Sequence, residues 1–436
     1  MVLATLLALA ASNPQATTPS STPTTAPRVV FDERTIARIL QHAPLPAPPA
    51  DPTNRFADDP RAATLGQALF FDARLSQDGK VSCATCHDPA RAFTDGRAVS
   101  RTIAPARRNA PSLYNVAQQR WLFWDGRADS LWSQALQPIE NPVEMGGDRR
   151  RALRAVADDA ALRARYELVF GALPASILAS NVPRATDHPV PERPNVDGRT
   201  TSAAADESVD RAFANLGKSI AAYERQLVSA NSAFDRFAAA LRANDLATQA
   251  AYPDDARRGL ALFVGKADCR LCHAGPLFSD GEFHDVGVPT FADPLAPDLE
   301  KRALAPLRDP GRREGVEKLR ADPFRASGAF SDAPDGEHAR ELDTLTVGVE
   351  LHAQVRTPSL RNVARTAPYM HQGQFATLDD VIAFYSTRNG AVPTGHHAET
   401  VLRPLGLTAD EARDLKAFLE SLTDESLPPE RTRAPR

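Results

Sequence analysis

Apolar residues recur every three or four positions along most of the chain, whereas the strict alternation that is typical of exposed strands is scarce. This pattern predicts a mainly α-helical fold, with short strands at most. The clearest helical pattern covers residues 209–237, which we expect to form one long helix that joins two parts of the molecule. Its apolar positions include Phe213, Leu216, Ile220, Tyr223 and Leu227.

A short pattern of apolar residues occurs twice. Residues 65–70 read LGQALF and residues 258–263 read RGLALF, and each is expected to form an amphipathic helix. The repetition predicts a duplicated module. Because 436 residues are enough for two domains with separate cores, we expect an N-terminal domain over residues 56–235 and a C-terminal domain over residues 236–436.

Three segments lack the pattern of a core. Residues 12–55 are rich in Pro, Thr and Ser and predict a linker, so that ordered structure would begin near Phe56. Residues 181–206 are polar and contain several prolines, and residues 290–345 are dense in Asp, Arg, Pro and Gly. Both of these stretches predict surface insertions.

The charged residues exclude one class of function. The chain has 51 Lys and Arg against 55 Asp and Glu, which gives a net charge of -4 with the two signs interspersed. A nucleic-acid-binding protein is expected to carry a clustered basic surface. We therefore expect no nucleic-acid partner.

All four cysteines belong to two copies of a Cys-x-x-Cys-His motif, CATCH at residues 83–87 and CRLCH at residues 269–273. Two thiols at this spacing can each add across one haem vinyl group, and the adjacent histidine then gives the iron its proximal nitrogen. A redox dithiol or half of a zinc site is the alternative for either copy, but nothing is left over to complete a zinc tetrahedron. The sequence therefore predicts two covalently bound haems c. The expected haem-binding residues are Cys83, Cys86, His87, Cys269, Cys272 and His273, with both histidines bound to iron.

Residues 1–11 form an apolar stretch that ends in the small-x-small pattern Ala8-Leu9-Ala10. The stretch is too short to span a bilayer and is typical of a secretory signal. No Lys or Arg precedes it, which leaves open that the segment is retained as an N-terminal membrane tether. Covalent haem attachment, which bacteria complete outside the cytoplasmic membrane, independently indicates export. We expect a periplasmic protein.

Six short segments match a known family in their order along the chain. They are LFFD (69–72), RNAPS (108–112), FWDGR (123–127), NPVEM (141–145), RTPSLRNV (356–363) and APYMH (367–371). Over most of its length, from residue 60 to 425, the chain resembles the bacterial di-haem cytochrome c peroxidase family, including its methylamine-utilisation branch, MauG. The resemblance implies two cytochrome c-like domains related by duplication, an N-terminal peroxidatic domain and a C-terminal electron-transfer domain.

The resemblance implies that hydrogen peroxide is activated at the first haem, which needs an open sixth iron position and a nearby acid–base group. Many family members block this position with a histidine in the loop after the first haem. Here no histidine occurs between His87 and His188, so we expect an open site unless a lysine or a distant histidine caps the iron. The family pattern makes Glu144 the acid–base group, Gln134 the hydrogen-bond partner of peroxide, and Pro138 a residue that shapes the pocket.

Two of these assignments depend on the family pattern. Without it, Glu144 would be an ordinary solvated loop carboxylate, and Trp124 would be a packing residue. The family pattern places Trp124 between the two haems, where an indole can relay an electron. We expect Trp124 to couple the two haem sites.

The second haem is expected to differ from that of standard family members, in which a methionine ligates the iron. The matching position is Tyr385, and the MauG branch also has tyrosine there. An anionic phenolate lowers the reduction potential, so this haem would share oxidising equivalents rather than store an electron. Met370 and His371 are alternative ligands, and a tyrosine on a helix is often a core residue.

The family also implies a calcium ion between the domains, held by a side-chain amide and two backbone carbonyls. Hard oxygen ligands of this kind suit calcium. The matching residues are Asn109, Thr366 and Pro368. This expectation depends wholly on the resemblance, because an asparagine in a loop is ordinarily a turn residue.

These residues predict a periplasmic di-haem peroxidase that reduces hydrogen peroxide at the first haem, with electrons from a small cytochrome c or cupredoxin through the second. One alternative is long-range oxidative modification of a protein substrate, as the MauG branch implies. A second is a non-catalytic di-haem electron-transfer cytochrome with both irons six-coordinate. A third is a haem-based sensor that signals through residues 290–345.

Overall fold

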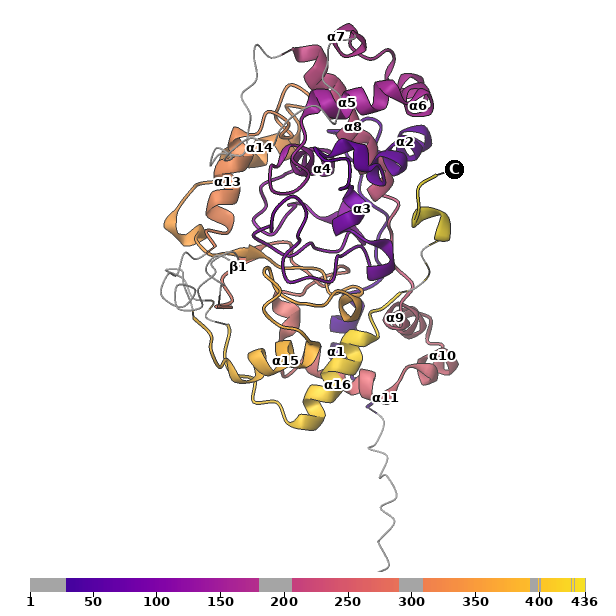
Figure 1. Cartoon of the computed structure of the whole chain (residues 1–436). Helices are drawn as coiled ribbons and strands as arrows, with labels where there is room; N and C mark the ends of the chain where they lie inside the picture. Colours follow the sequence, from indigo (N-terminus) through magenta and orange to yellow (C-terminus); the bar gives the residue numbers. More distant parts are fainter. Residues whose placement is uncertain are drawn as a thin grey trace, which may run out of the picture.

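The computed structural model is mainly helical, as the apolar spacing predicts, and the described residues contain one small sheet, in which β1 pairs with β2 in antiparallel order. Figure 1 shows two helical modules, an upper one in indigo to magenta and a lower one in salmon to yellow. The structure describes residues 29–179, 206–289, 309–392, 399, 401–424, 426 and 428–435. The helices and strands are α1 (Glu33–Leu40), α2 (Pro60–Phe70), α3 (Cys83–Cys86), α4 (Leu131–Glu140), α5 (Arg149–Asp158), α6 (Ala160–Phe170), α7 (Ala175–Leu178), α8 (Glu207–Glu224), α9 (Ala233–Ala243), α10 (Leu246–Ala251), α11 (Asp254–Val264), β1 (Phe283–His284), α13 (Arg312–Ala321), α14 (Glu337–Thr344), β2 (Val355–Arg356), α15 (Leu378–Thr387) and α16 (Ala409–Glu420).

Some of the predicted segments lie outside the described residues. They are the signal-like residues 1–11, residues 12–28 of the predicted linker, residues 181–205 of the first predicted insertion and residues 290–308 of the second. Among the described helices, none has both the length and the apolar character that crossing a bilayer requires. The cleaved signal and the membrane tether therefore stay predictions.

The repeat found in the sequence corresponds to two helix pairs that share one contact. In the first module α2 packs against α8, and in the second α11 packs against α16. A Cβ atom at Gly66 would lie 1.8 Å from the carbonyl oxygen of Ser219, and one at Gly259 would lie 1.9 Å from that of Asp414. Only glycine allows helices to approach this closely. The glycine at the same place in LGQALF and RGLALF thus allows the same close helix contact in both modules.

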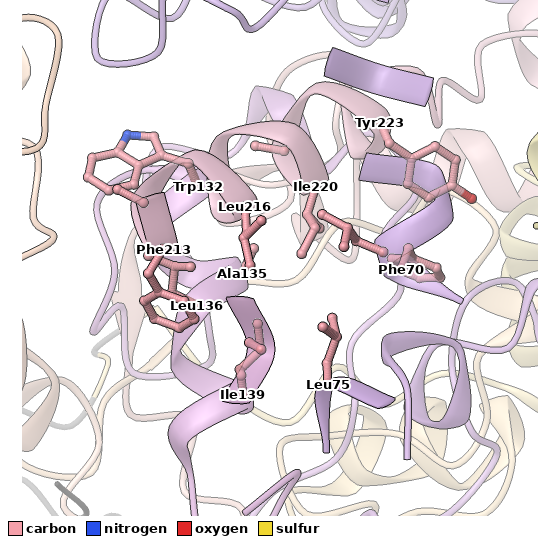
Figure 2. Packing of buried hydrophobic residues seen from close by; sticks show 14 of the residues in the cluster. Phe70, Leu75, Trp132, Ala135, Leu136, Ile139, Phe213, Leu216, Ile220 and Tyr223 are labelled. Carbon is pink, nitrogen blue, oxygen red and sulfur yellow. The ribbon is translucent and has the colours of Figure 1, made fainter. Parts of the chain in front are cut away.

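Each module has its own apolar core, and a haem-binding motif lies against each core. In the first module, Leu216 and Ile220 of α8 share the core with Leu136 of α4 and with Leu75 (Figure 2). In the second, the core forms between α9, α11, α15 and α16. Cys83 packs against the first core and Cys269 against the second. The division into two modules follows from these separate cores.

Part of the predicted linker is folded. Residues 29–55 contain α1, and Ile39 of this helix is fully buried in the core of the second module, where Figure 1 shows the helix. His42 follows α1 and stacks on Phe278, with 4.7 Å between the ring centroids. The expectation of a linker is wrong for these residues, because their apolar side chains are buried in the core of the second module.

The second predicted insertion crosses over to the first module. Residues 309–345 contain α13 and α14, which lie beside the upper module in Figure 1. Phe324 and Phe330 are buried in the first core. The same segment is fixed by an ion pair between Arg108 Nη2 and Asp309 Oδ1, 2.5 Å apart. The expectation of a surface insertion is therefore wrong for 309–345, because its few apolar residues are core residues.

The predicted long helix is broken. Residues 209–237 form two helices, α8 and α9, separated by a loop that both modules hold through Ser229. The Ser229 N–H donates to Asn115 Oδ1 at 2.8 Å, and Asn362 Nδ2 donates to Ser229 Oγ at 2.8 Å. Ser232 then caps α9. Tertiary hydrogen bonds to the loop outweigh the helical pattern of the sequence.

The C-terminal residues return to the first module. Gln67 Nε2 donates to the carbonyl oxygens of Glu430 at 2.5 Å and of Arg433 at 2.7 Å. The Tyr223 hydroxyl donates to the carbonyl oxygen of Arg431 at 2.5 Å. Figure 1 shows the C-terminus next to α2, far from the second module that precedes it in the sequence.

Candidate functional site

The first Cys-x-x-Cys-His motif lies on the single turn of α3, which ends at Cys86. His87 follows, and its Nδ1 lies 3.0 Å from the carbonyl oxygen of Phe93. A carbonyl accepts a hydrogen bond, so the ring proton is on Nδ1 and Nε2 keeps its lone pair. Burial lowers the pKa of His87, which favours the neutral ring. Both properties suit an iron ligand.

The second motif has the same geometry. His273 Nδ1 lies 2.8 Å from the carbonyl oxygen of Phe278, and burial also lowers the pKa of this histidine. Its Nε2 is therefore the atom available to a metal. No disulfide joins the four cysteines of the two motifs, so all four sulfur atoms are available for thioether bonds.

A longer repeat lies behind the two histidines, with PSLYNVA at residues 111–117 and PSLRNVA at residues 358–364. In each copy the serine hydroxyl donates at 2.7 Å to a backbone carbonyl oxygen, that of Ala92 in one module and that of Leu277 in the other. The next residue in each case is the phenylalanine whose carbonyl binds the histidine. In each copy the asparagine is left-handed, with φ of 58° and 61°, and starts a short 3-10 helix. This repeat was not predicted, although comparing the two stretches directly would have revealed it.

The first motif opens into a cavity next to α4. The lining brings together Cys83, Cys86 and His87 with the four residues predicted to act there, Trp124, Gln134, Pro138 and Glu144. Among the described residues, no second histidine lines this cavity. Lys318 of α13 lines it too, and its Nζ pairs with Glu314 Oε1 at 2.8 Å. The described lining therefore holds no counterpart of the histidine that caps the iron in many family members.

Glu144 lies on the loop that follows α4. Its Oε1 accepts a hydrogen bond from Asn141 Nδ2 at 2.9 Å. Burial raises the pKa of Glu144, while the charge of Arg127 and the bond from Asn141 oppose the rise. Arg127 is already paired with Asp125, at 3.1 Å between Nη1 and Oδ1. Glu144 therefore keeps a proton more readily than an exposed glutamate does.

Gln134 and Pro138 lie one turn apart on α4, and both line the cavity. A proline has no N–H group, so Pro138 cannot donate to the carbonyl of Gln134 in the usual helical bond. The ring also adds an apolar wall beside the amide. This end of α4 therefore presents one polar side chain within an apolar surface.

Trp124 lies at the boundary of the modules and faces His371, with ring centroids 6.4 Å apart in an edge contact. The two residues occupy equivalent places. Each follows a residue of positive φ, Phe123 at 66° and Met370 at 71°, inside a loop closed by one antiparallel bridge. Burial lowers the pKa of His371 to about 4, so this ring is neutral.

Two backbone hydrogen bonds cross the boundary, and they are equivalent, because Asn109 corresponds to Arg356 and His371 corresponds to Trp124. The Asn109 N–H donates to the carbonyl of His371, and the Arg356 N–H donates to the carbonyl of Trp124, each at 2.8 Å. Trp124 Nε1 also donates to the carbonyl of Asn109 at 3.0 Å. The indole is therefore fixed between the two modules by its own ring nitrogen and by its backbone.

The same equivalence places Tyr385. Pro138 comes 14 residues after Trp124 (138 − 124), and Tyr385 comes 14 residues after His371 (385 − 371). Pro138 lies on α4 and Tyr385 on α15, and a serine or threonine caps the start of each helix. Tyr385 thus occupies in the second module the place that Pro138 occupies over the first motif.

The surroundings of Tyr385 agree with this placement. Burial raises the pKa of its hydroxyl, the thiols of Cys269 and Cys272 add to the rise, and Arg388 opposes it. The phenol therefore lies near the second motif. Met370, by contrast, lines a second cavity, at the module boundary.

This second cavity brings together the three residues predicted to hold calcium, Asn109, Thr366 and Pro368. Asn109 Nδ2 donates to the carbonyl of Arg97 at 2.6 Å, which leaves Oδ1 as the acceptor of this amide. Trp124 lines both cavities. The predicted calcium residues thus lie together, next to the residue predicted to couple the haems.

One buried acid on the first cavity was not predicted. Glu224 of α8 is 4% exposed, its Oε2 has no hydrogen-bond partner among the described residues, and burial raises its pKa to about 8. Ser219 and Asp414 are equivalent, because each contacts the shared glycine of its module. Five residues further along, Glu224 of α8 therefore corresponds to Leu419 of α16. The sequence offered one signal for this buried acid, which was a glutamate on the apolar face of the predicted helix.

Residues 60–243 match the family model described as di-haem cytochrome c peroxidase. A relative from Denitromonas iodatirespirans, cytochrome-c peroxidase IdrP1, is 35% identical over 392 residues, which cover 89% of this chain and 87% of that protein. The chain belongs to the di-haem cytochrome c peroxidase family. It is also similar to the methylamine utilization protein MauG of Methylorubrum extorquens, with 32% identity over 89% of this chain and 84% of the relative.

Solved structures agree with this membership of the di-haem cytochrome c peroxidase family. A MauG-like protein associated with microbial copper homeostasis is 28% identical with a TM-score of 0.61, covering 90% of this chain and 97% of that one. The diheme peroxidase BthA from Burkholderia thailandensis is 27% identical with a TM-score of 0.61, covering 89% and 94%. The family resemblance and the fold class predicted from the sequence are confirmed.

As a di-haem cytochrome c peroxidase, the chain binds two haems c, and its residues fit them. Each motif offers two free thiols and a neutral histidine whose Nε2 keeps its lone pair. The first motif also lines a cavity whose walls combine apolar side chains, such as Leu113 and Ile220, with charged and polar ones, such as Glu144 and Arg356. Cys83, Cys86 and His87 would hold the first haem, and Cys269, Cys272 and His273 the second.

Proposed function

We propose that this oxidoreductase reduces hydrogen peroxide in the first cavity, with electrons from a small cytochrome c or cupredoxin that enter through the second haem. The observation that carries the proposal is the position of Glu144, a partly buried acid that lines the same cavity as His87. The described lining holds no second histidine. Peroxide therefore has both an open side and a proton source.

The bound haem supplies the iron at which the O–O bond is cleaved and the electrons that this cleavage needs. Glu144 holds the proton for the leaving oxygen, and Asn141 fixes its carboxyl group through the 2.9 Å hydrogen bond. The amide of Gln134 orients the bound peroxide. Pro138 keeps the space beside that amide apolar, so water competes less for the site.

The second half of the proposal concerns electron delivery. Trp124 is held between the modules by hydrogen bonds from both sides, and this supports a role in coupling the two haem sites. Tyr385 would bind the iron of the second haem, because it takes the place of Pro138 and lies near Cys269 and Cys272. His371 is at the boundary with Trp124 instead.

Two further parts of the proposal come from the family. A calcium ion would bind to Asn109, Thr366 and Pro368, which line one cavity. The protein would act in the periplasm, after export by the signal-like residues 1–11. Both parts can be tested by calcium analysis of the purified protein and by fractionation.

A second candidate function is long-range oxidation of the side chains of a protein substrate. The tyrosine at position 385 favours it, because a phenolate ligand lowers the potential and lets the second haem share oxidising equivalents. Similarity to the MauG of Methylorubrum extorquens gives independent support. In this case the electrons come from the substrate protein and not from a redox carrier.

The experiment is peroxide consumption by the ferric, two-haem protein without prior reduction, with E144Q beside the wild type. Glutamine keeps the size and loses the proton, so we expect the rate with peroxide to fall about 10²–10⁴-fold, the usual range for a general acid–base group. Low-temperature EPR of both ferric proteins should show one high-spin and one low-spin haem. An unchanged rate in E144Q, or two low-spin haems that ignore peroxide, would refute the proposal.

E140Q is the matched control. Glu140 ends α4, close in sequence to Glu144, but its carboxylate pairs with Arg149 at 2.7 Å outside the cavity. We expect E140Q to react with peroxide at the wild-type rate. Equal losses in both variants would indicate general damage to this region.

A further inference from the structure

Arg356 is a buried arginine that pairs with no acid in the described part of the chain. The residue is 3% exposed. Its guanidinium donates hydrogen bonds to two carbonyl oxygens, from Nε to that of Phe123 and from Nη1 to that of Thr357, each at 3.3 Å. Among the described residues, no carboxylate pairs with it. Burial lowers the pKa of Arg356 to about 10. An unpaired buried cation is costly, so a partner outside the polypeptide is expected.

The position of Arg356 shows where that partner would lie. The residue belongs to β2 and lines both cavities, including the one that holds Cys83, Cys86 and His87. Its backbone N–H donates to the carbonyl of Trp124 at 2.8 Å. The equivalent residue of the other module is Asn109, which is neutral. The cation is therefore a feature of only one side of the boundary.

Arg312 shows how this protein accommodates a buried arginine when no ligand is involved. It is also 3% exposed, and burial lowers its pKa to about 10. Its guanidinium lies 4.3 Å from the Trp121 ring centroid and 4.1 Å from that of Phe283, and Nη1 donates to the carbonyl of Gly126 at 2.8 Å. It lines neither cavity. Within the described ranges, no aromatic ring lies over the guanidinium of Arg356, so its charge is left for a ligand.

We propose that Arg356 binds a propionate carboxylate of the haem attached through Cys83 and Cys86. Propionates are the anionic groups that a haem brings into its pocket, and the planar guanidinium fork matches a carboxylate with two parallel hydrogen bonds. Because the same residue holds the backbone of Trp124, it ties the edge of the first haem to the tryptophan at the boundary. This goes beyond peroxide reduction, and it rests on the proposed function only for assigning the high-spin haem to Cys83 and Cys86.

The test is a reductive spectroelectrochemical titration of the two-haem protein without peroxide, following the high-spin and the low-spin haem separately. R356Q removes a cation near the first haem, which makes the ferric state easier to keep. We expect the equilibrium constant for reducing the high-spin haem to fall at least tenfold, which is 59 mV for one electron. R312Q, which removes an equally buried cation from outside the cavity, should stay within threefold of the wild type.

Three results would overturn the proposal: a high-spin haem within threefold of the wild type in R356Q, a shift confined to the low-spin haem, or an equal shift in R312Q. If R356Q fails to fold, R356K takes its place. Lysine keeps the charge as a point donor, so R356K should stay within threefold of the wild type, and a tenfold fall would overturn the proposal. No peroxide is used, so failure of the peroxide chemistry is distinguishable from failure here.

Discussion

Replacing Glu224 with glutamine should remove a pH-dependent loss of stability. Burial raises the pKa of Glu224 to about 8 in the folded chain, from its usual 4.5. The folded state therefore keeps a proton that the unfolded chain releases between these values. The stability that this acid contributes is fully present below pH 4.5 and is lost as the pH rises through about 8.

The magnitude follows from the difference between the two pKa values. The shift is 8 − 4.5 = 3.5 units, and one unit corresponds to about 1.4 kcal/mol, so the whole window is worth about 5 kcal/mol. Between pH 5 and pH 7 the wild type should lose about 3 kcal/mol relative to E224Q. Glutamine keeps the shape of the side chain but has no proton to lose.

The assay is urea unfolding of the two-haem protein at pH 5, 6, 7 and 8, followed by circular dichroism, for the wild type and E224Q. Both proteins share every other titrating group, so their difference in unfolding free energy isolates Glu224. E207Q is the control, because Glu207 lies on the same helix but is exposed. A difference between E224Q and the wild type that stays constant from pH 5 to pH 8 would refute the reasoning, since Glu224 would then be solvated or paired.

Two further predictions concern the helix crossing and the second axial ligand. G259A should destabilise the protein by about 1–3 kcal/mol, the usual cost of overpacking, because the new Cβ would lie 1.9 Å from the carbonyl of Asp414; unfolding midpoints that match the wild type would contradict this contact. Y385M should raise the potential of the low-spin haem by on the order of 0.1 V, because a thioether favours ferrous iron more than a phenolate does and axial ligands span about 0.8 V. An unchanged low-spin potential and spectrum in Y385M would exclude Tyr385 as the ligand.

The parts of the fold that follow local rules could be predicted from the sequence. The Cys-x-x-Cys-His spacing is set by the haem vinyl groups and needs no tertiary context. The glycine shared by LGQALF and RGLALF marked a duplicated helix, because the same close contact recurs at Gly66 and Gly259. The residues of the first cavity, such as Glu144, came from the family resemblance and not from spacing.

The parts that depend on distant contacts could not be predicted. The loop at Ser229 interrupts a convincing helical pattern only because Asn115 and Asn362 reach it from the two modules. Likewise, Phe324 sits in a stretch whose composition is that of a loop, and only the first core makes it a buried residue. Composition and periodicity describe a segment, whereas these outcomes depend on its neighbours in space.

The crossing of segments between modules bears on how the protein matures. The first core includes Phe330, and the tail residues that bind Gln67 are among the last of the chain. The first module therefore stays incomplete until residues as late as Arg433 have been synthesised. Until then, the wall around Cys83 and Cys86 lacks the residues that the later part of the chain contributes, Glu314, Lys318 and Arg356. For the same reason, cutting the loop at Ser229 would not yield two independent halves, because each module is built from both sides of the cut.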